Sequence, residues 1–193
     1  MKMRGGLTRG AAPAVLLAAV AGSTMGATAA SANAQETQKP HAGMLRYPDV
    51  SRDKIVFVYA NDLWTVARSG GVASPLASPA GQEMFPRFSP DGSEIVFQGN
   101  YDGDRDLYTI GAEGGVPMRV THHPANETPT DWHSSGLIFH MGGTHGIGRL
   151  QELYRVSPEG GMPELLPVPY GANGSMSDDG EWIAYTPEQR DFR

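Results

Sequence analysis

The chain has no cysteine among its 193 residues. It therefore cannot form a disulfide bond, present a thiolate nucleophile or bind a metal through sulfur. It also has no uninterrupted apolar stretch of the roughly 18 residues that a membrane-spanning helix needs. These two absences exclude a disulfide-stapled scaffold and a helical membrane span.

Basic residues are fewer than acidic ones, with 15 Lys and Arg against 21 Asp and Glu, for a formal charge of −6. Three of the basic residues, Lys2, Arg4 and Arg9, lie in the first 34 residues, which contain no acid. Without that segment the formal charge moves from −6 to −9. An acidic surface argues against a nucleic-acid partner and against binding to anionic membranes.

The N-terminal segment has the three parts of a secretory signal peptide. Basic residues precede an apolar run from Ala11 to Ala21, and small residues follow as far as Ala34. We predict a signal peptide at residues 1–34 with cleavage after Ala34, and the small residues at 27–29 offer an alternative site. A disordered, alanine-rich leader that stays attached is the other interpretation. A disulfide-free exported protein is compatible with a bacterial periplasm, so we expect a periplasmic or secreted protein.

The residues from Phe85 to Thr121 form a unit that the rest of the chain repeats. The turn sequence Ser89-Pro90-Asp91-Gly92 favours chain reversal, and the Gly114-Gly115 pair suits a tight hairpin. Ile95-Val96-Phe97 is a continuous apolar run, which is typical of a strand covered on both faces. The unit predicts four strands, at Met84–Phe88, Glu94–Gln98, Asp106–Ile110 and Pro117–Thr121.

The repeats share a fixed spacing and a variable one. The first glycine of the pair lies seven positions after the leucine of the third strand in each complete repeat (63 to 70, 107 to 114, 153 to 160). The distance from the second strand to that leucine grows from 8 to 12 to 16 (55 to 63, 95 to 107, 137 to 153). A repeat of about 40 residues with four strands and one variable loop is the signature of a β-propeller.

We therefore predict an all-β fold, a β-propeller of four-stranded antiparallel blades. A polar linker at 35–43 precedes a partial propeller at 44–193, with blades at about 45–80, 84–124 and 129–169 and an incomplete blade at 173–193. About three and a half blades leave the ring unclosed, so we expect this chain by itself to aggregate or to unfold with poor cooperativity.

Histidines and alternating carboxylates are the candidates for metal chemistry. Adjacent residues such as His122 and His123 point in different directions and cannot easily bind one ion, so we expect structural or solvated roles for them. We expect the same of His133, His140 and His145, in or beside the variable loop of the third blade. The stretch from Asp102 to Asp106 alternates carboxylates like a calcium loop but lacks the required glycine, which favours a solvated hairpin tip over calcium binding.

The sequence contains no G-x-S-x-G nucleophile motif and no dinucleotide-binding fingerprint. Trp64, Tyr108 and Tyr154 recur at one repeat position, which indicates that they are blade-packing residues, and we expect the same role for Trp132 and Trp182 in other strands. We therefore predict no catalytic residue, no metal ligand and no cofactor site in this chain.

The pattern of S-P-D-G, a short apolar run, D-L-Y and G-G resembles the propeller repeats of TolB and of prolyl-oligopeptidase-type enzymes. Further stretches resemble the N-terminal propeller region of tricorn-type proteases across residues 44–193. They are Leu45-Arg46-Tyr47-Pro48 through Asp62-Leu63-Trp64-Thr65-Val66, Gly70-Gly71-Val72-Ala73, Val120-Thr121-His122-His123-Pro124-Ala125, Leu166-Pro167-Val168-Pro169-Tyr170-Gly171, Gly174-Ser175 and Ile183-Ala184-Tyr185-Thr186-Pro187. One departure is Asp178, where the repeat usually has proline before its Asp, and we expect it to loosen that turn.

The tricorn resemblance implies a longer parent protein with further propeller blades, a PDZ-like domain and a tail-specific serine peptidase core beyond Arg193. It implies that the propeller admits or guides unfolded peptide or protein substrates while holding no catalytic residue, and it leaves a homo-oligomer open. The first alternative is a TolB-like periplasmic propeller that binds a protein partner without catalysis. The second is the propeller of a prolyl-oligopeptidase-type hydrolase.

Overall fold

The computed structural model describes residues 41–77, 80–142 and 150–188. The chain divides into two units, residues 1–38 and residues 39–193, and every described residue belongs to the second unit. Apart from one short 3-10 turn at Ala42–Met44, the regular structure described is all strand. The described part accordingly includes no helix of the length and apolar character needed to cross a membrane.

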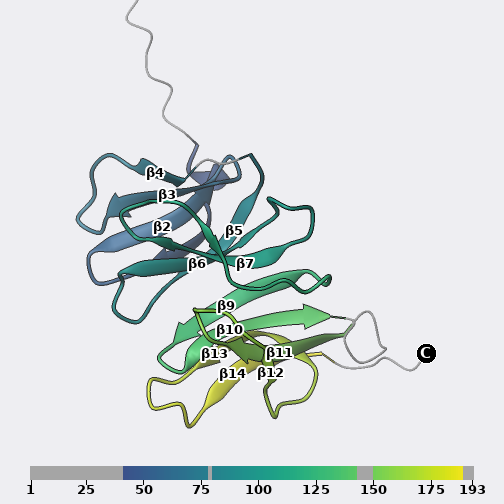
Figure 1. The fold of residues 1–193 in the computed structure, drawn as a ribbon. Coiled ribbons are helices and arrows are strands. Elements are labelled where there is room, and N and C mark those ends of the chain that lie inside the picture. The colour runs from purple at the N-terminus through teal and green to yellow at the C-terminus, as the bar shows by residue number, and fades with distance from the viewer. Residues whose placement is uncertain (1–40, 78–79, 143–149, 189–193) are drawn as a thin grey trace, which may run out of the picture. The chain divides into compact units, whose positions relative to one another are not determined.

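The strands form four antiparallel sheets, each built from strands that are consecutive in the chain (Figure 1). Blade 1 contains β1 (Arg46–Val50), β2 (Lys54–Tyr59), β3 (Asp62–Ala67) and β4 (Ser74–Ala77); blade 2 contains β5 (Glu83–Phe88), β6 (Glu94–Gly99), β7 (Asp106–Gly111) and β8 (Met118–Arg119); blade 3 contains β9 (Glu127–His133), β10 (Gly136–Gly142), β11 (Gln151–Val156) and β12 (Glu164–Leu165); and blade 4 contains β13 (Gly171–Met176) and β14 (Ile183–Pro187).

The predicted fold class is confirmed, with three four-stranded blades and two strands of a fourth in an unclosed ring. First strands of successive blades lie against each other, β1 with β5, β5 with β9 and β9 with β13. In blade 2 the first three strands fall within one residue of their predicted ends. The fourth is shorter, because β8 covers only Met118–Arg119 of the predicted Pro117–Thr121.

The apolar cores lie between neighbouring blades. One cluster joins Leu63 and Leu76 of blade 1 to Phe97 of blade 2, and a second joins Leu107 of blade 2 to Phe139 of blade 3. The predicted two-sided burial of the second strand is confirmed in blade 2, where residues 95–97 have no exposed surface. In blade 1 the equivalent residues 55 and 57 are only half-buried, because among the described residues only those of blade 2 pack against this blade.

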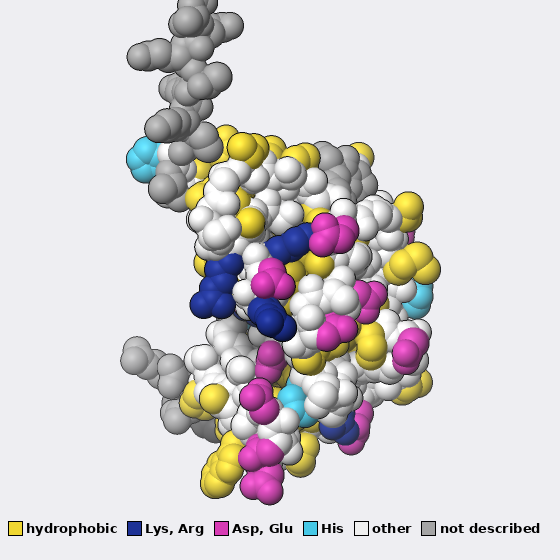
Figure 2. All heavy atoms as spheres, turned by 90° about the vertical axis from the view of Figure 1, so that its left-hand side faces the viewer, with side chains coloured by type: hydrophobic (Ala, Val, Ile, Leu, Met, Phe, Trp, Pro, Cys, Tyr) yellow, Lys and Arg dark blue, Asp and Glu magenta, His cyan; other side chains and the backbone are white. Residues whose placement is uncertain are grey.

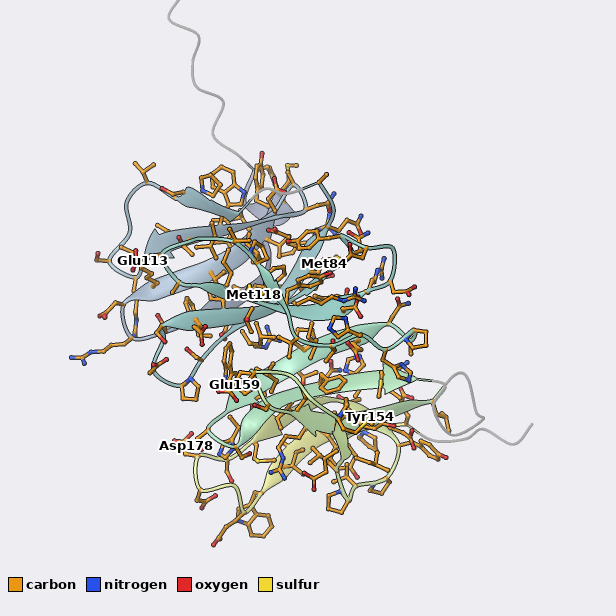
Figure 3. All side chains as sticks on the ribbon, viewed as in Figure 1. Met84, Glu113, Met118, Tyr154, Glu159 and Asp178 are labelled. Atoms are coloured by element: carbon orange, nitrogen blue, oxygen red, sulfur yellow. The ribbon has the colours of Figure 1, made fainter. Side chains whose placement is uncertain are left out.

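The aromatic residues at the shared repeat position pack as predicted in blades 2 and 3. The Tyr108 ring stacks on Phe97 with centroids 5.9 Å apart, and the Tyr154 ring stacks on Phe139 at 5.7 Å. Trp64 of blade 1 is half-buried and meets Tyr59 edge-on, again with a 5.9 Å separation. Figure 3 shows Tyr154 among the strands of blade 3.

The other two tryptophans differ from each other. Trp132 lies in β9 and is 8% exposed, which confirms its packing role. The same prediction was wrong for Trp182, which precedes β14 and is 75% exposed. The face on which Trp182 would pack needs a neighbouring surface that the described residues do not supply.

The turn between the first and second strands of each blade, here the A–B turn, is set by local hydrogen bonds. In blade 2, Gly92 N donates to Ser89 O at 2.8 Å and the Ser89 hydroxyl donates to Asp91 Oδ1 at 2.6 Å. That hydroxyl bond is the main reason that the pKa of Asp91 falls to about 2. In blade 4 the same bonds form around Ser177 at 2.7 and 2.6 Å. The turn at Asp178 therefore keeps its hydrogen bonds, and the expected loosening is not seen.

The turn between the third and fourth strands, here the C–D turn, also repeats. Gly114 N donates to Gly111 O at 2.9 Å, and the same bond closes the turns at Gly70 (2.8 Å) and Gly160 (2.9 Å). One fixed geometry is therefore confirmed. The expected tight hairpin at the glycine pair was wrong, because residues 112–117 separate β7 from β8 and the hydrogen-bonded turn runs from Gly111 to Gly114.

These glycines also meet the preceding blade. A Cβ atom on Gly114 would lie 3.1 Å from Leu76 O of blade 1, and one on Gly160 would lie 3.1 Å from Val120 O of blade 2. A Cβ atom on Gly70, in the first of the described blades, would have nothing within 4 Å. The fixed spacing of the repeats therefore reflects contact between blades as well as turn conformation.

Candidate functional site

The A–B and C–D turns lie at the same end of the blades, where Figure 3 shows Glu113, Glu159 and Asp178. Figure 2 looks onto this end, where acidic side chains are spread from the upper middle of the face to its lower edge. The loops between second and third strands lie at the opposite end. Part of the longest of them, residues 143–149, lies outside the described residues, and His145 with it.

The remaining histidines are spread over the fold. His122 is exposed, while the Nδ1 atom of the half-buried His123 accepts a bond from Ala125 N at 3.0 Å. His140 lies in β10 beside the variable loop, as expected, and burial lowers its pKa. The predicted position of His133 was wrong, because it ends β9 at the opposite end of the sheet. The described ranges contain no group of three or more His, Asp or Glu placed to bind a metal.

The carboxylate-rich stretch divides into two environments. Asp102 and Asp104 are exposed, as expected of a solvated tip. The expectation was wrong for Asp106, which begins β7 and has no exposed surface. Its Oδ2 atom lies 2.7 Å from Arg119 Nη2, while Nη1 of the same guanidinium lies 3.2 Å from Asp102 Oδ2.

Two further buried carboxyls, Glu83 and Glu127, were missed by sequence reasoning. Both begin the first strand of a blade, and both have no exposed surface. Glu83 accepts from Leu63 N at 2.7 Å and from the Tyr101 hydroxyl at 2.5 Å, which ties blade 2 to blade 1. Each lies six residues before its A–B turn, which is the signal that repeat alignment could have supplied.

Glu127 ties blade 3 to blade 2. Its backbone N donates to Arg105 O at 2.8 Å, and its carboxyl accepts from the Thr121 hydroxyl. Burial raises the pKa of Glu127 to about 7, with a further upward contribution from Asp106, while its hydrogen bonds and Arg119 act in the opposite direction. Burial likewise raises the pKa of Glu83. These groups act in the junctions between blades.

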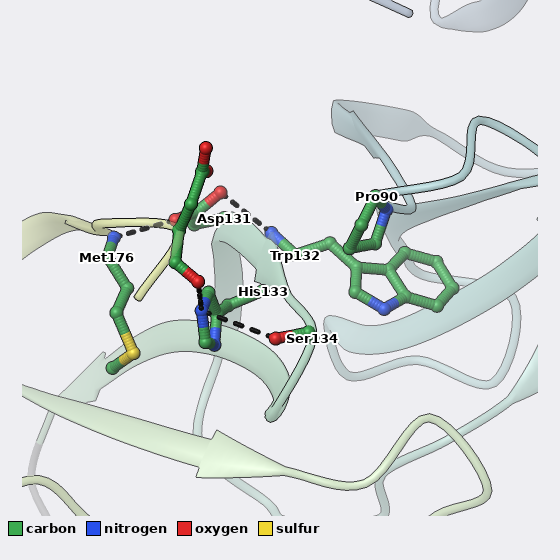
Figure 4. Close-up of a pocket in the computed structure, with 7 residues that line it drawn as sticks. Pro90, Asp131, Trp132, His133, Ser134 and Met176 are labelled. Atoms are coloured by element: carbon green, nitrogen blue, oxygen red, sulfur yellow. Dashed lines mark hydrogen bonds between the residues drawn. The ribbon is translucent and has the colours of Figure 1, made fainter. Parts of the chain in front are cut away.

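A pocket of about 340 Å³ lies at the turn end, between blades 2, 3 and 4 (Figure 4). Asp131 of β9 forms one wall, and its Oδ2 atom accepts from Met176 N of blade 4 at 2.7 Å. Blade 1 uses the equivalent Asp49 in the same way, accepting from Phe88 N of blade 2 at 2.7 Å. The residues that line the pocket are Pro90, Asp131, Trp132, His133, Ser134, Met176 and Asp178.

One hydrogen bond in this region has the partners of a catalytic dyad. His133 Nδ1 lies 2.8 Å from Ser135 Oγ. The same Nδ1 accepts from Ser135 N at 3.1 Å, so the ring proton is on Nε2, which faces the backbone carbonyl of Asp178 at 3.3 Å. Arg155 Nη1 also donates to Ser135 Oγ at 3.3 Å. The ring therefore completes a local turn, in which Nδ1 faces both the backbone N–H and the hydroxyl of Ser135.

Successive four-stranded antiparallel blades with cores between them define a β-propeller domain. The chain belongs to the family described as the tricorn protease N-terminal β-propeller domain, whose model matches residues 42–193. It is 27% identical over 143 residues to tricorn protease homolog 1 of Streptomyces coelicolor, covering 73% of this chain and 13% of the relative. It is 33% identical over 88 residues to the tricorn protease of Thermoplasma acidophilum, covering 44% of this chain and 8% of the relative.

Solved structures show the same fold. The structure of the tricorn protease matches with a TM-score of 0.57 and 25% identity, over 70% of this chain and 14% of that one. TolB from Acinetobacter baumannii matches with a TM-score of 0.61 and 20% identity, over 76% of this chain and 39% of that one. The chain thus spans a small part of the tricorn relatives it resembles.

Proposed function

We propose that this chain is the N-terminal propeller region of an exported, tricorn-like serine peptidase, and that it admits or guides peptide substrates. The observation that carries the proposal is the family match across residues 42–193, a range that contains all the described strands. The matched relatives are named tricorn proteases, and this chain covers 13% or less of the two relatives above. The PDZ-like and peptidase domains that supply the chemistry then belong to the rest of the parent protein.

Peptide hydrolysis tests whether the catalytic group lies outside the 193-residue chain. The purified 193-residue chain should leave unstructured peptides intact and should not react with a fluorophosphonate probe that labels active serines. The product of the complete coding sequence should cleave the peptides and should react with the probe. Cleavage or labelling by the 193-residue chain would show that the catalytic group lies within it.

The guiding role needs a separate measurement on the longer product. Deleting residues 44–193 should preserve labelling by the fluorophosphonate while changing the relative rates at which long and short unstructured peptides are cleaved. Unchanged relative rates would remove substrate guidance from the proposal. Export is tested by sequencing the N-terminus of the mature protein, which should begin at Gln35.

A TolB-like scaffold remains the alternative, because the A–B turn motif and the glycine pair are shared with that class. The coding sequence after Arg193 separates the two. A tail-specific serine core supports the peptidase, and a stop codon soon after closure of the propeller supports the scaffold. A G-x-S-x-G motif in that position would support a prolyl-oligopeptidase-type hydrolase.

A further inference from the structure

Two carboxyl groups are buried beside one guanidinium where blade 3 meets blade 2. Glu127 of β9 and Asp106 of β7 both have no exposed surface. Among the described residues, the ion pairs of Arg119 are with Asp106 at 2.7 Å and with Asp102 at 3.2 Å. Glu127 therefore has no cationic partner of its own. The contact of Glu127 with Asp106, Arg119 and Thr121 is here called the 2–3 junction.

Each buried carboxyl also has an oxygen atom that is left without a donor. Glu127 Oε2 accepts from the Thr121 hydroxyl, but Glu127 Oε1 and Asp106 Oδ1 accept no hydrogen bond from the residues that the structure describes. An ionised carboxylate buried in this way loses its hydration without full compensation, whereas a protonated carboxyl carries no charge. Burial accordingly raises the pKa of both groups, that of Glu127 to about 7. The 2–3 junction is thus suited to a pair that carries a single negative charge.

The matching junction between blades 1 and 2 is arranged differently. Glu83 holds the same repeat position in blade 2 and is equally buried. Leu63 N donates to its Oε2 atom at 2.7 Å, and the Tyr101 hydroxyl donates to its Oε1 atom at 2.5 Å. In the 2–3 junction the equivalent Leu107 N donates instead to Thr121 Oγ1, at 2.9 Å. An ionised carboxylate is therefore better satisfied in blade 2 than in blade 3.

The elements around Glu127 carry other titratable or charged groups. They are Asp102, Asp104 and Arg105 before β7, His122 and His123 after β8, Glu159 in the C–D turn of blade 3, His140 of β10, and Glu83 and Arg87 of β5. In the sheet Glu127 pairs with Met141 and the next residue pairs with His140, so His140 lies on the opposite face. His122, His123 and Glu159 line the same pocket of about 440 Å³ as Glu127. Because histidines generally titrate near neutral pH, their effect has to be separated from that of Glu127.

We propose that Glu127 and Asp106 together hold one proton and form a pH-sensitive switch that closes the 2–3 junction. With the proton, the pair carries one negative charge, Arg119 balances that charge, and the junction is closed. When the proton leaves to solvent, Glu127 becomes a buried carboxylate with an unsatisfied oxygen, and the junction opens towards the pocket that Glu127 lines, where water can hydrate the carboxylate. The switch goes beyond the proposed function, because it concerns the stability of the ring and does not depend on a substrate.

The direction of the switch follows from the folded and ordinary pKa values of Glu127. Its pKa in the closed junction, about 7, lies above the ordinary value of 4.5. The closed junction is therefore fully stabilised below pH 4.5, and this stabilisation is lost as pH rises to about 7.

Hydrogen exchange of the 193-residue chain at about pH 5 and about pH 8 tests the switch, with rates corrected by those of the urea-unfolded chain. The amides of Leu107 and Glu127 donate across the 2–3 junction, to Thr121 Oγ1 and Arg105 O. Their protection should fall at least about tenfold at the higher pH. The amides of Leu63 and Glu83 donate across the junction between blades 1 and 2 and should lose less protection. Equal losses at the two junctions, or no loss at the 2–3 junction, overturn the switch.

Matched variants assign the response to Glu127. Glu127→Gln mimics the neutral carboxyl and should keep the 2–3 junction protected at both pH values, whereas Glu83→Gln, His122→Gln and His123→Gln should leave the response unchanged. A response that persists in Glu127→Gln, or that disappears in either histidine variant, overturns the switch. If circular dichroism shows that Glu127→Gln does not fold, Asp106→Asn provides the comparison, because it frees Arg119 to balance Glu127 and should reduce the response.

Discussion

The glycine pairs allow a test of contact between blades with a control inside the same chain. Gly160 and Gly70 both have φ of 91° and both close the same C–D turn. They differ in surroundings, because a Cβ on Gly160 would lie 3.1 Å from Val120 O and one on Gly70 would meet nothing within 4 Å. Substitution by alanine therefore separates backbone strain from crowding against the neighbouring blade.

The cost of backbone strain and the cost of crowding against the neighbouring blade can be compared. Alanine at this positive φ costs roughly 1–3 kcal/mol at either position, and the loss of flexibility in the unfolded chain is common to both. Crowding against a backbone carbonyl, which cannot swing aside like a side chain, adds about 1–2 kcal/mol at Gly160 alone. The difference corresponds to roughly 3–6 °C in melting temperature for a chain of this size.

Thermal unfolding followed by circular dichroism measures this order. Gly160→Ala should melt below Gly70→Ala, and Gly114→Ala should resemble Gly160→Ala because its Cβ would lie 3.1 Å from Leu76 O. If all three variants melt together, the second role assigned to the glycines, close contact between blades, is refuted. If the melts are broad, urea denaturation with the same three variants gives the comparison.

Three further predictions concern the junctions and the surface. The pKa of Glu127 in the folded protein, about 7, exceeds its ordinary value of 4.5, so the free energy of unfolding should fall by about 3 kcal/mol as pH rises between these values. In Glu127→Gln, the free energy of unfolding measured by urea titration should depend less on pH across this range. An unchanged pH dependence would contradict the raised pKa of Glu127. Asp131→Ala removes the acceptor for Met176 N and should cost about 1–3 kcal/mol in urea unfolding, whereas Asp104→Ala at the exposed tip should cost under about 0.5 kcal/mol; equal costs would remove the stabilising role of Asp131. Trp182→Ser should reduce concentration-dependent light scattering without lowering the melting temperature, because the side chain is 75% exposed, and a large loss of stability would show that it packs.

Repeat spacing and turn chemistry were sufficient to predict the blades. Positions such as Gly92 and Gly114 are decided by the conformation of a few adjacent residues, and an apolar run such as Ile95-Val96-Phe97 favours a strand covered on both faces. These signals are local, so they survive in a single sequence. The β8 strand was overestimated because only Met118 and Arg119 pair with β7, which depends on the partner strand.

The environment of individual polar residues was decided by the tertiary structure. Asp106 belongs to the same alternating stretch as Asp104, yet Asp106 is fully buried against Arg119 while Asp104 is exposed. Glu127 has no local feature that distinguishes it from a surface glutamate. Its burial depends on blade 2, where Arg105 O and the Thr121 hydroxyl are its hydrogen-bond partners.

The candidate site also combines a feature visible in the sequence with one that only the tertiary structure shows. Sequence comparison singled out Asp178 as a departure from the repeat, and only the structure placed it beside Trp132 and Asp131 of another blade. The sequence alone determined the blade and its turns, because both follow from contacts within a repeat. It also determined the family resemblance, because the motifs that carry it are stretches of sequence. The tertiary structure decided which side chains are buried, which are exposed and which line a pocket, because the cores and the pocket are shared between blades distant in sequence.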